Sequence, residues 1–137
     1  MTYKIYEDPE RSLITVSFSG SVDDREILHM MDELYGRSGF ADADQFIDFS
    51  QVKHYAITPK GMVNYNEVAR ERTERAPAKK NRKIVLYAPD DLTFGMARLL
   101  ASVASNSGIN LEVFRDLPKA LDFIGLDRLP AQSEKNG

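Results

Sequence analysis

One short segment near the middle of the chain constrains the fold more than any other. Residues 84–87 read Ile-Val-Leu-Tyr, an apolar run with a helical pattern before it and another after it. Such a run is typical of a strand that is covered on both faces. Strands that alternate with helices form largely parallel sheets with right-handed crossovers. The segment therefore predicts an α/β fold in which helices cover the sheet.

The rest of the chain continues this alternation. Apolar and polar residues alternate in the predicted strands, and apolar residues recur every three or four positions in the predicted helices. We expect strands at 3–6, 13–18, 46–49, 84–87 and 109–114, and helices at 23–35, 58–75, 92–105 and 116–124. The order is β-β-α-β-α-β-α-β-α. The first two strands form a hairpin through a turn at 8–11, the second strand breaks at Gly20-Ser21, and residues 50–57 are irregular.

The composition predicts one domain and restricts its partners. The 137 residues suit a single core, which we assign to 1–126, with a disordered polar tail at 127–137. The absence of cysteine removes disulfides and thiolate chemistry and suits a cytoplasmic location. A net charge of −3 argues against a nucleic-acid partner, and no apolar stretch is long enough for an integral membrane segment.

Three segments resemble a known family. Residues 48–52, Asp-Phe-Ser-Gln-Val, resemble the D-L-S-x-V segment of the STAS family, which joins sulfate transporters to anti-sigma factor antagonists. Residues 88–96 and 113–121 resemble the C-terminal half of small, mostly uncharacterised SpoIIAA-like bacterial proteins. The resemblance implies a SpoIIAA-like, STAS-like fold, with a mixed, mostly parallel sheet of about five strands and an N-terminal hairpin. It also implies a non-enzymatic interaction or regulatory module.

One departure from the family bears on regulation. Anti-sigma factor antagonists have a D-S-S-G stretch after the central strand, and its serine is phosphorylated at a helix start. The corresponding residues here are 55–61, which lack the serine pair, and Thr58 is the nearest candidate. A threonine before Pro59 is also a typical helix cap, so capping is the stronger interpretation.

Polar side chains gather where the predicted parallel strands end. Ligands tend to bind beyond these carboxyl ends. The candidates for binding or regulation there are Ser50, Thr58, Asp90, Asp91 and Thr93, with Arg115 and Asp116 beside them. Each aspartate in this group is also a preferred helix cap, which is its more common role.

The third helix carries more apolar residues than one buried face needs. Leu92, Phe94, Met96, Leu99, Leu100 and Val103 cover more than one of its faces. Such a helix is buried or meets a partner. We expect a homodimer or a protein interface here that involves Phe94 or Met96. Gly95 inside this helix indicates close packing on the sheet or, less often, a partner near the backbone.

Signals for catalysis and metal binding are weak. The chain has no G-x-S-x-G motif and no cysteine, and its only two histidines, His29 and His54, form no paired motif. We therefore expect no enzyme, no catalytic residue, no cofactor and no metal. The basic run at 70–83 has no interleaved aromatic residues, which fits a solvated helix end better than a nucleic-acid surface.

Three functions remain open, in this order. The first is a module that docks a protein partner or a second copy through residues 50–58, with Tyr55 and Thr58 in the contact. The second is a small apolar-ligand or lipid-binding protein, because the STAS fold is also likened to lipid-transfer domains. The third and weakest is an enzyme that uses the aspartates at the strand ends.

Overall fold

The computed structural model describes residues 2–37, 42–75, 82–104 and 110–128, apart from a few side chains in α2 and α3. Strands and helices follow one another in the predicted order. They are β1 (Tyr3–Asp8), β2 (Leu13–Asp23), α1 (Asp24–Tyr35), β3 (Asp44–Ala56), α2 (Pro59–Arg75), β4 (Lys83–Tyr87), α3 (Asp91–Ala104), β5 (Asn110–Phe114) and α4 (Leu117–Ile124). The predicted tail falls mainly on residues 129–137, which lie outside the described part of the chain.

The five strands form one sheet in the order β1-β2-β3-β4-β5. β1 pairs with β2 in the antiparallel sense, and the Asp8–Arg11 turn that joins them is closed by a 3.2 Å hydrogen bond from the Arg11 N–H to the Asp8 carbonyl. The pairs β2–β3, β3–β4 and β4–β5 are all parallel. The predicted hairpin and the predicted parallel sheet are both confirmed.

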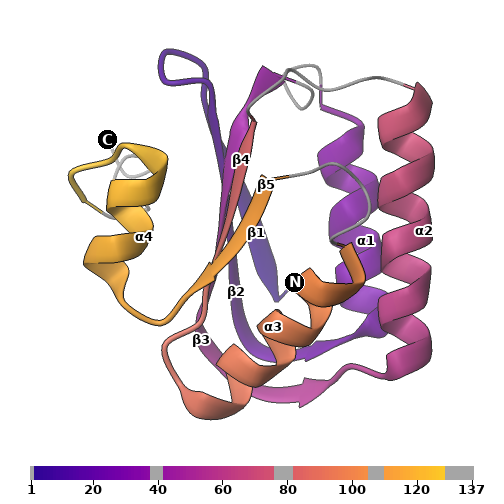
Figure 1. The fold of residues 1–137 in the computed structure, drawn as a ribbon. Helices are drawn as coiled ribbons and strands as arrows, with labels where there is room; N and C mark the ends of the chain where they lie inside the picture. The colour runs from indigo at the N-terminus through magenta and orange to yellow at the C-terminus, as the bar shows by residue number, and fades with distance from the viewer. Residues whose placement is uncertain (1, 38–41, 76–81, 105–109, 129–137) are drawn as a thin grey trace.

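The helices cover the two faces of the sheet unequally. α1, α2 and α3 lie on one face, and α4 lies alone on the other (Figure 1). Successive residues of a strand point to opposite faces of the sheet, so they contribute alternately to two apolar layers, one on each face. The layer under α1–α3 contains Ile14, Val16, Phe18, Ile47, Phe49, Ile84 and Leu86. The layer under α4 contains Leu13, Phe46, Val85, Ala120, Leu121 and Ile124.

Two strands are longer than predicted. β2 continues through Gly20 to Asp23, and β3 continues through the segment that we expected to be irregular, to Ala56. Their register shifts between Ser17 and Ser19 and again after Gly20, whose φ of 72° suits glycine. Gly20 therefore marks a bulge in β2 and not its end. The predicted irregular stretch at 50–57 is wrong because it pairs with the far half of β2.

The predicted helix boundaries are mostly confirmed. Asp23 caps α1 by accepting a 2.8 Å hydrogen bond from the Glu26 N–H, and Gly36 follows its last residue. Asp116 caps α4, and Gly125 ends it with a φ of 80°. The predicted stops at Pro77 and Gly108 lie outside the described residues. Among the described helices, none has both the length and the apolar character that a membrane crossing requires.

Candidate functional site

The aspartates predicted at the strand ends are each used within the fold. Asp48 is 2% exposed, and its carboxylate accepts a 2.8 Å hydrogen bond from the N–H of Ser50. Asp90 accepts hydrogen bonds from the N–H and the hydroxyl of Thr93, at 2.8 and 2.7 Å. These bonds lower the pKa of Asp90, and the bond from the Thr93 backbone N–H has the largest effect. Asp90 and Thr93 therefore form a helix cap.

The remaining strand-end charges pair with one another. Asp91 forms an ion pair with Arg115, whose guanidinium also donates to the Pro89 carbonyl at 3.3 Å. Asp116 caps α4. In the described part of the chain, no group of three or more His, Asp or Glu side chains is arranged to hold a metal. The predicted cluster thus consists of helix caps, a local hydrogen bond and an ion pair.

Thr58 also has a structural role. Its hydroxyl caps α2 by accepting a 2.9 Å hydrogen bond from the Gly61 N–H, and it donates to Asp24 at 2.6 Å. The hydroxyl of Tyr65 also donates to Asp24. A Cβ at Gly61 would collide with the Asp24 carboxylate in this position, so a larger residue there would displace the carboxylate. A phosphate on Thr58 would lie against this carboxylate, which disfavours Thr58 as a phosphorylation site and agrees with the preference for capping.

Tyr55 turns its ring inward from the exposed end of β3. Gln51, Lys53 and His54 are exposed, but the Tyr55 hydroxyl is buried without a hydrogen-bond partner. Burial raises the pKa of Tyr55 to about 12. The ring lines a small pocket of about 20 Å³ that also contains side chains of α2 and α3. This volume has room for about one water molecule.

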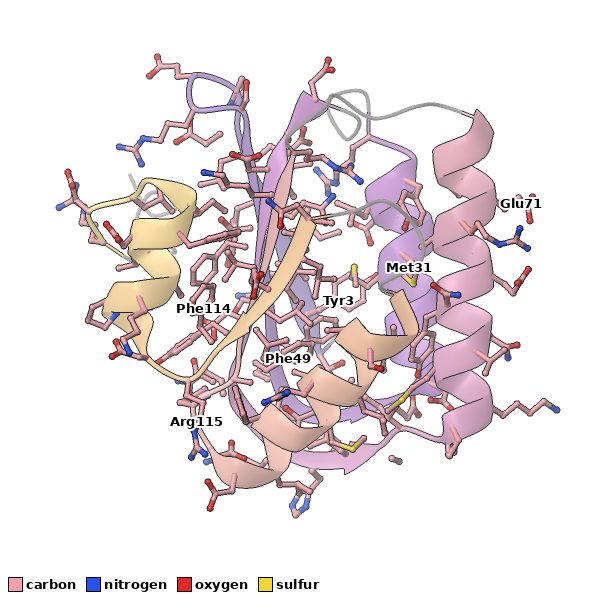
Figure 2. The ribbon with its side chains drawn as sticks, in the orientation of Figure 1. Tyr3, Met31, Phe49, Glu71, Phe114 and Arg115 are labelled. Atoms are coloured by element: carbon pink, nitrogen blue, oxygen red, sulfur yellow. The ribbon has the colours of Figure 1, made fainter. Side chains whose placement is uncertain are left out.

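A larger pocket lies between the helices and the sheet, and we call it the helix–sheet pocket. Its volume is about 100 Å³, and it is partly open. Its lining consists of Ile27, Met30, Met31, Leu34, Tyr35, Gln45, Ile47, Phe49, Tyr65, Asn66, Ala69, Ile84, Leu86 and Leu111. Met31 comes from the α1 side and Phe49 from the sheet side (Figure 2). An engineered apolar cavity of roughly 150 Å³ binds benzene, so a single ring approximates the size of ligand that could fit.

Two polar side chains in this lining have unsatisfied atoms. Gln45 on β3 is 3% exposed, and its Nε2 is buried without a hydrogen-bond partner. Asn66 on α2 is partly buried, and its Oδ1 is also without one. A buried polar group without a partner costs about 1–3 kcal/mol. With Tyr55, three of the four such side-chain atoms identified among the described residues line this pocket or the small one beside it.

The lining carries no charge. Among the described side chains of the helix–sheet pocket, none is Asp, Glu, Lys, Arg or His. Burial raises the pKa of Tyr35 to about 12, and burial together with the bond to Asp24 raises the pKa of Tyr65 further. Both phenols are therefore neutral at ordinary pH. The site suits a neutral ligand, because an unpaired charge is costly to bury.

Gln45 and Asn66 were not among the residues that the sequence analysis selected. A signal for both exists in the chain. Gln45 lies two residues before Ile47 and four before Phe49, so it shares one face of β3 with these two apolar residues. Asn66 lies four residues after Met62 and three before Ala69, on the inward side of α2. An amide inside an apolar stripe is the pattern to look for.

The exposed apolar surface of α3 differs from the predicted one. Met96 lines the small pocket, and the partly buried Phe94 ring lies 5.2 Å from the Arg115 guanidinium. Among the described side chains of α3, the large apolar ones that are exposed are Leu92 and Leu99, at 63% and 51%. The side chains of Leu100 and Val103 lie outside the described part of the structure. Gly95 lies between Leu92 and Leu99, and a Cβ built there would meet nothing within 4 Å. Close packing is thus the wrong explanation for Gly95, and a partner near the backbone stays a prediction.

Comparison with known proteins supports the fold. No family model and no curated protein matches the chain. Among solved structures, the chain is similar to an uncharacterised protein of the DUF3478 family with a SpoIIAA-like fold from Shewanella loihica PV-4. The TM-score is 0.53 and the sequence identity is 11%, over 89% of this chain and 91% of that chain. At this identity the likeness concerns the fold alone. The chain has a SpoIIAA-like fold, as the STAS resemblance implied.

Proposed function

We propose that this chain is a non-catalytic binding protein that holds a small apolar molecule in the helix–sheet pocket. The observation that carries the proposal is the buried, unpaired Nε2 of Gln45, which lines a mainly apolar pocket of about 100 Å³. Ligand pockets are mainly apolar with a few polar groups that orient the ligand. The strand-end aspartates support catalysis less well, because caps and ion pairs occupy them.

The methionines of the chain offer a direct test. Met30 and Met31 line the helix–sheet pocket, Met62 and Met96 line the small pocket, and Met1 is the fifth. In a carbon–proton NMR spectrum of methyl-labelled methionine, a toluene titration is expected to give saturable shifts at Met30 and Met31. A shift that grows with toluene concentration without saturating is taken as a nonspecific effect. The absence of saturable shifts at the two pocket methyls, up to the solubility of toluene, would overturn the proposal.

A variant that fills the pocket makes this test specific. Ala69 lines the pocket from α2, so Ala69→Leu is expected to abolish the toluene shifts while the protein stays folded. Val63→Leu is the matched control, because Val63 lies on the same helix with 57% of its surface exposed. Equal toluene binding by both variants would place the ligand elsewhere on the protein and count against the proposed site.

A second function, docking of another copy of this chain, is favoured by the outer face of α3. Leu92 lies three residues before Gly95 and Leu99 four residues after it, so all three share one face of the helix. A two-fold axis near Gly95 would pair Leu92 of one copy with Leu99 of the other, as a self-complementary interface requires. The open backbone at Gly95 would allow two such helices to approach closely.

Light scattering after size exclusion, across a dilution series, tests this docking. A dimer at high concentration that Leu99→Glu converts to a monomer is the expected result. The control is Arg98→Glu, an exposed change of charge at the next residue. A strict monomer at high concentration would remove self-association from consideration, and it would leave the pocket proposal untouched.

A further inference from the structure

The unpaired amide atoms of Gln45 and Asn66 restrict the chemistry of a ligand more than the apolar lining does. The inference drawn from them rests on the proposed function. The geometry points to a neutral, ring-sized molecule that carries one hydroxyl group, such as a phenol or a cyclic alcohol. Gln45 lines the pocket from β3 and Asn66 lines it from α2. Each requirement on the ligand follows from a separate feature of the lining.

The apolar lining favours a flat, polarisable body. The rings of Phe49, Tyr35 and Tyr65 and the thioethers of Met30 and Met31 contribute to it. Aromatic rings pack well against other rings, and methionine sulfur makes favourable contacts at ring edges. No charged side chain is found among the described lining residues, so the body of the ligand is neutral.

The orphaned atoms favour a hydroxyl over other polar groups. Gln45 offers a donor at Nε2, and Asn66 offers an acceptor at Oδ1. A hydroxyl both donates and accepts, so it is the smallest group that can bond to both. A carboxylate only accepts, and it would leave the Asn66 oxygen unpaired next to a negative charge. An alkyl group would leave both amides as they are.

The competing explanation is a water molecule that occupies the same position. A bound water would satisfy the amides and leave them without a free donor or acceptor for a ligand hydroxyl. Phenol and toluene distinguish the two explanations, because they have similar shape and differ in one hydroxyl. In a pocket without polar partners, toluene binds more tightly, since phenol loses hydrogen bonds to water on entering. A pocket that uses Gln45 and Asn66 instead binds phenol more tightly.

Dissociation constants for both probes, measured on the full chain from the Met30 and Met31 methyl shifts, test the inference. We expect phenol to bind more tightly than toluene. In Gln45→Leu the ratio of the two constants is expected to change by about tenfold or more in favour of toluene, as the loss of one buried hydrogen bond implies. Gln51→Leu is the matched control, because Gln51 is an exposed glutamine on the same strand.

Asn66→Leu provides an independent arm, with the exposed Asn64→Leu on the same helix as its control. A ligand-free methyl spectrum like that of the native chain shows that each variant is folded. If one variant fails to fold, the other carries the test.

The results distinguish failure of the hydroxyl inference from failure of the proposed apolar site. Toluene binding that equals or exceeds phenol binding in the native chain overturns the hydroxyl inference and leaves the apolar site standing. A phenol preference that persists in both variants also overturns it. Binding of neither probe overturns the proposed function together with the inference.

Discussion

The two faces of the sheet are built differently. Under α4, the contact residues Phe46, Val85 and Ala120 are all 0% exposed. Polar groups along this layer are paired: Lys83 donates to the Phe123 carbonyl at 3.0 Å, and its own N–H donates to Asp44 at 2.9 Å. No unpaired buried side-chain atom was found on this face in the part of the chain that the structure describes. An open hollow of about 640 Å³ lies at the edge of this layer and is lined in part by Leu13, Asp44 and Ile124. Elsewhere the layer has the features of a structural core.

The face under α1–α3 departs from this pattern. It contains the helix–sheet pocket and the unpaired side-chain atoms of Gln45, Asn66 and Tyr55. Buried polar groups in native proteins are nearly always paired, and an exception calls for an explanation. One sheet can thus be packed for stability on one face and keep unsatisfied polar atoms on the other. Three experiments test this contrast between the two faces.

The largest effect is expected when an alanine is enlarged on each face. Ala120 is 0% exposed under α4, so we expect Ala120→Leu to overpack this layer and to lower the free energy of unfolding by about 1–3 kcal/mol. Ala69→Leu enters the helix–sheet pocket, and its cost is expected to stay below about 1 kcal/mol. Urea denaturation of both variants measures the difference. If both variants lose stability equally, the two faces are packed alike and the contrast fails.

Removal of the unpaired donor of Gln45 is expected to change the free energy of unfolding by a smaller amount and in the opposite direction. Gln45→Leu replaces a buried amide with an apolar side chain of similar size, and it should raise the free energy of unfolding by about 1 kcal/mol. The exposed Gln51→Leu should change it by less than about 0.5 kcal/mol. Loss of stability in Gln45→Leu would show that the amide has a partner in solution. A gain in stability with a loss of phenol preference is the pattern of a functional residue.

The sequence predicted the fold well because its signals are local. The alternation in 13–18, the apolar run at 84–87 and the caps at Asp23 and Asp116 each depend on residues close in the chain. The far halves of β2 and β3 were missed because Gln51, Lys53 and His54 are exposed, which hides the alternation of a strand. Their pairing depends on a bulge at Gly20, which brings together residues about thirty positions apart.

The candidate site was largely beyond prediction from the sequence. Asp90, Asp91, Thr93 and Thr58 were correctly seen as polar residues at element ends, and capping was correctly preferred for Asp90 and Thr58. Whether a buried amide lacks a partner depends on neighbours from three elements, which no local pattern encodes. Gln45 on β3 and Asn66 on α2 line one pocket although they are distant in the chain.

The smallest expected effect concerns the polar link that holds α1 against the start of α2. Burial alone raises the pKa of Asp24, but hydrogen bonds from Thr58 and Tyr65 outweigh burial and lower it below its ordinary value of 3.8. Because the folded-state pKa is the lower one, these bonds stabilise the fold fully above the unfolded-state value. Their contribution is lost as the pH falls through the folded-state pKa.

We therefore expect the free energy of unfolding to fall between about pH 5 and pH 3 by a smaller amount in Asp24→Asn than in the native chain. Urea denaturation at a series of pH values measures this slope, and Tyr65→Phe should reduce it in part because one donor to Asp24 is removed. Asp122→Asn, at an exposed aspartate of α4 on the opposite face, is the control and should leave the slope nearly unchanged. An unchanged slope in Asp24→Asn would mean that the link contributes no stability. The orientation of α2 over the pocket would then depend on apolar packing and on the exposed ion pair between Arg72 and Asp32.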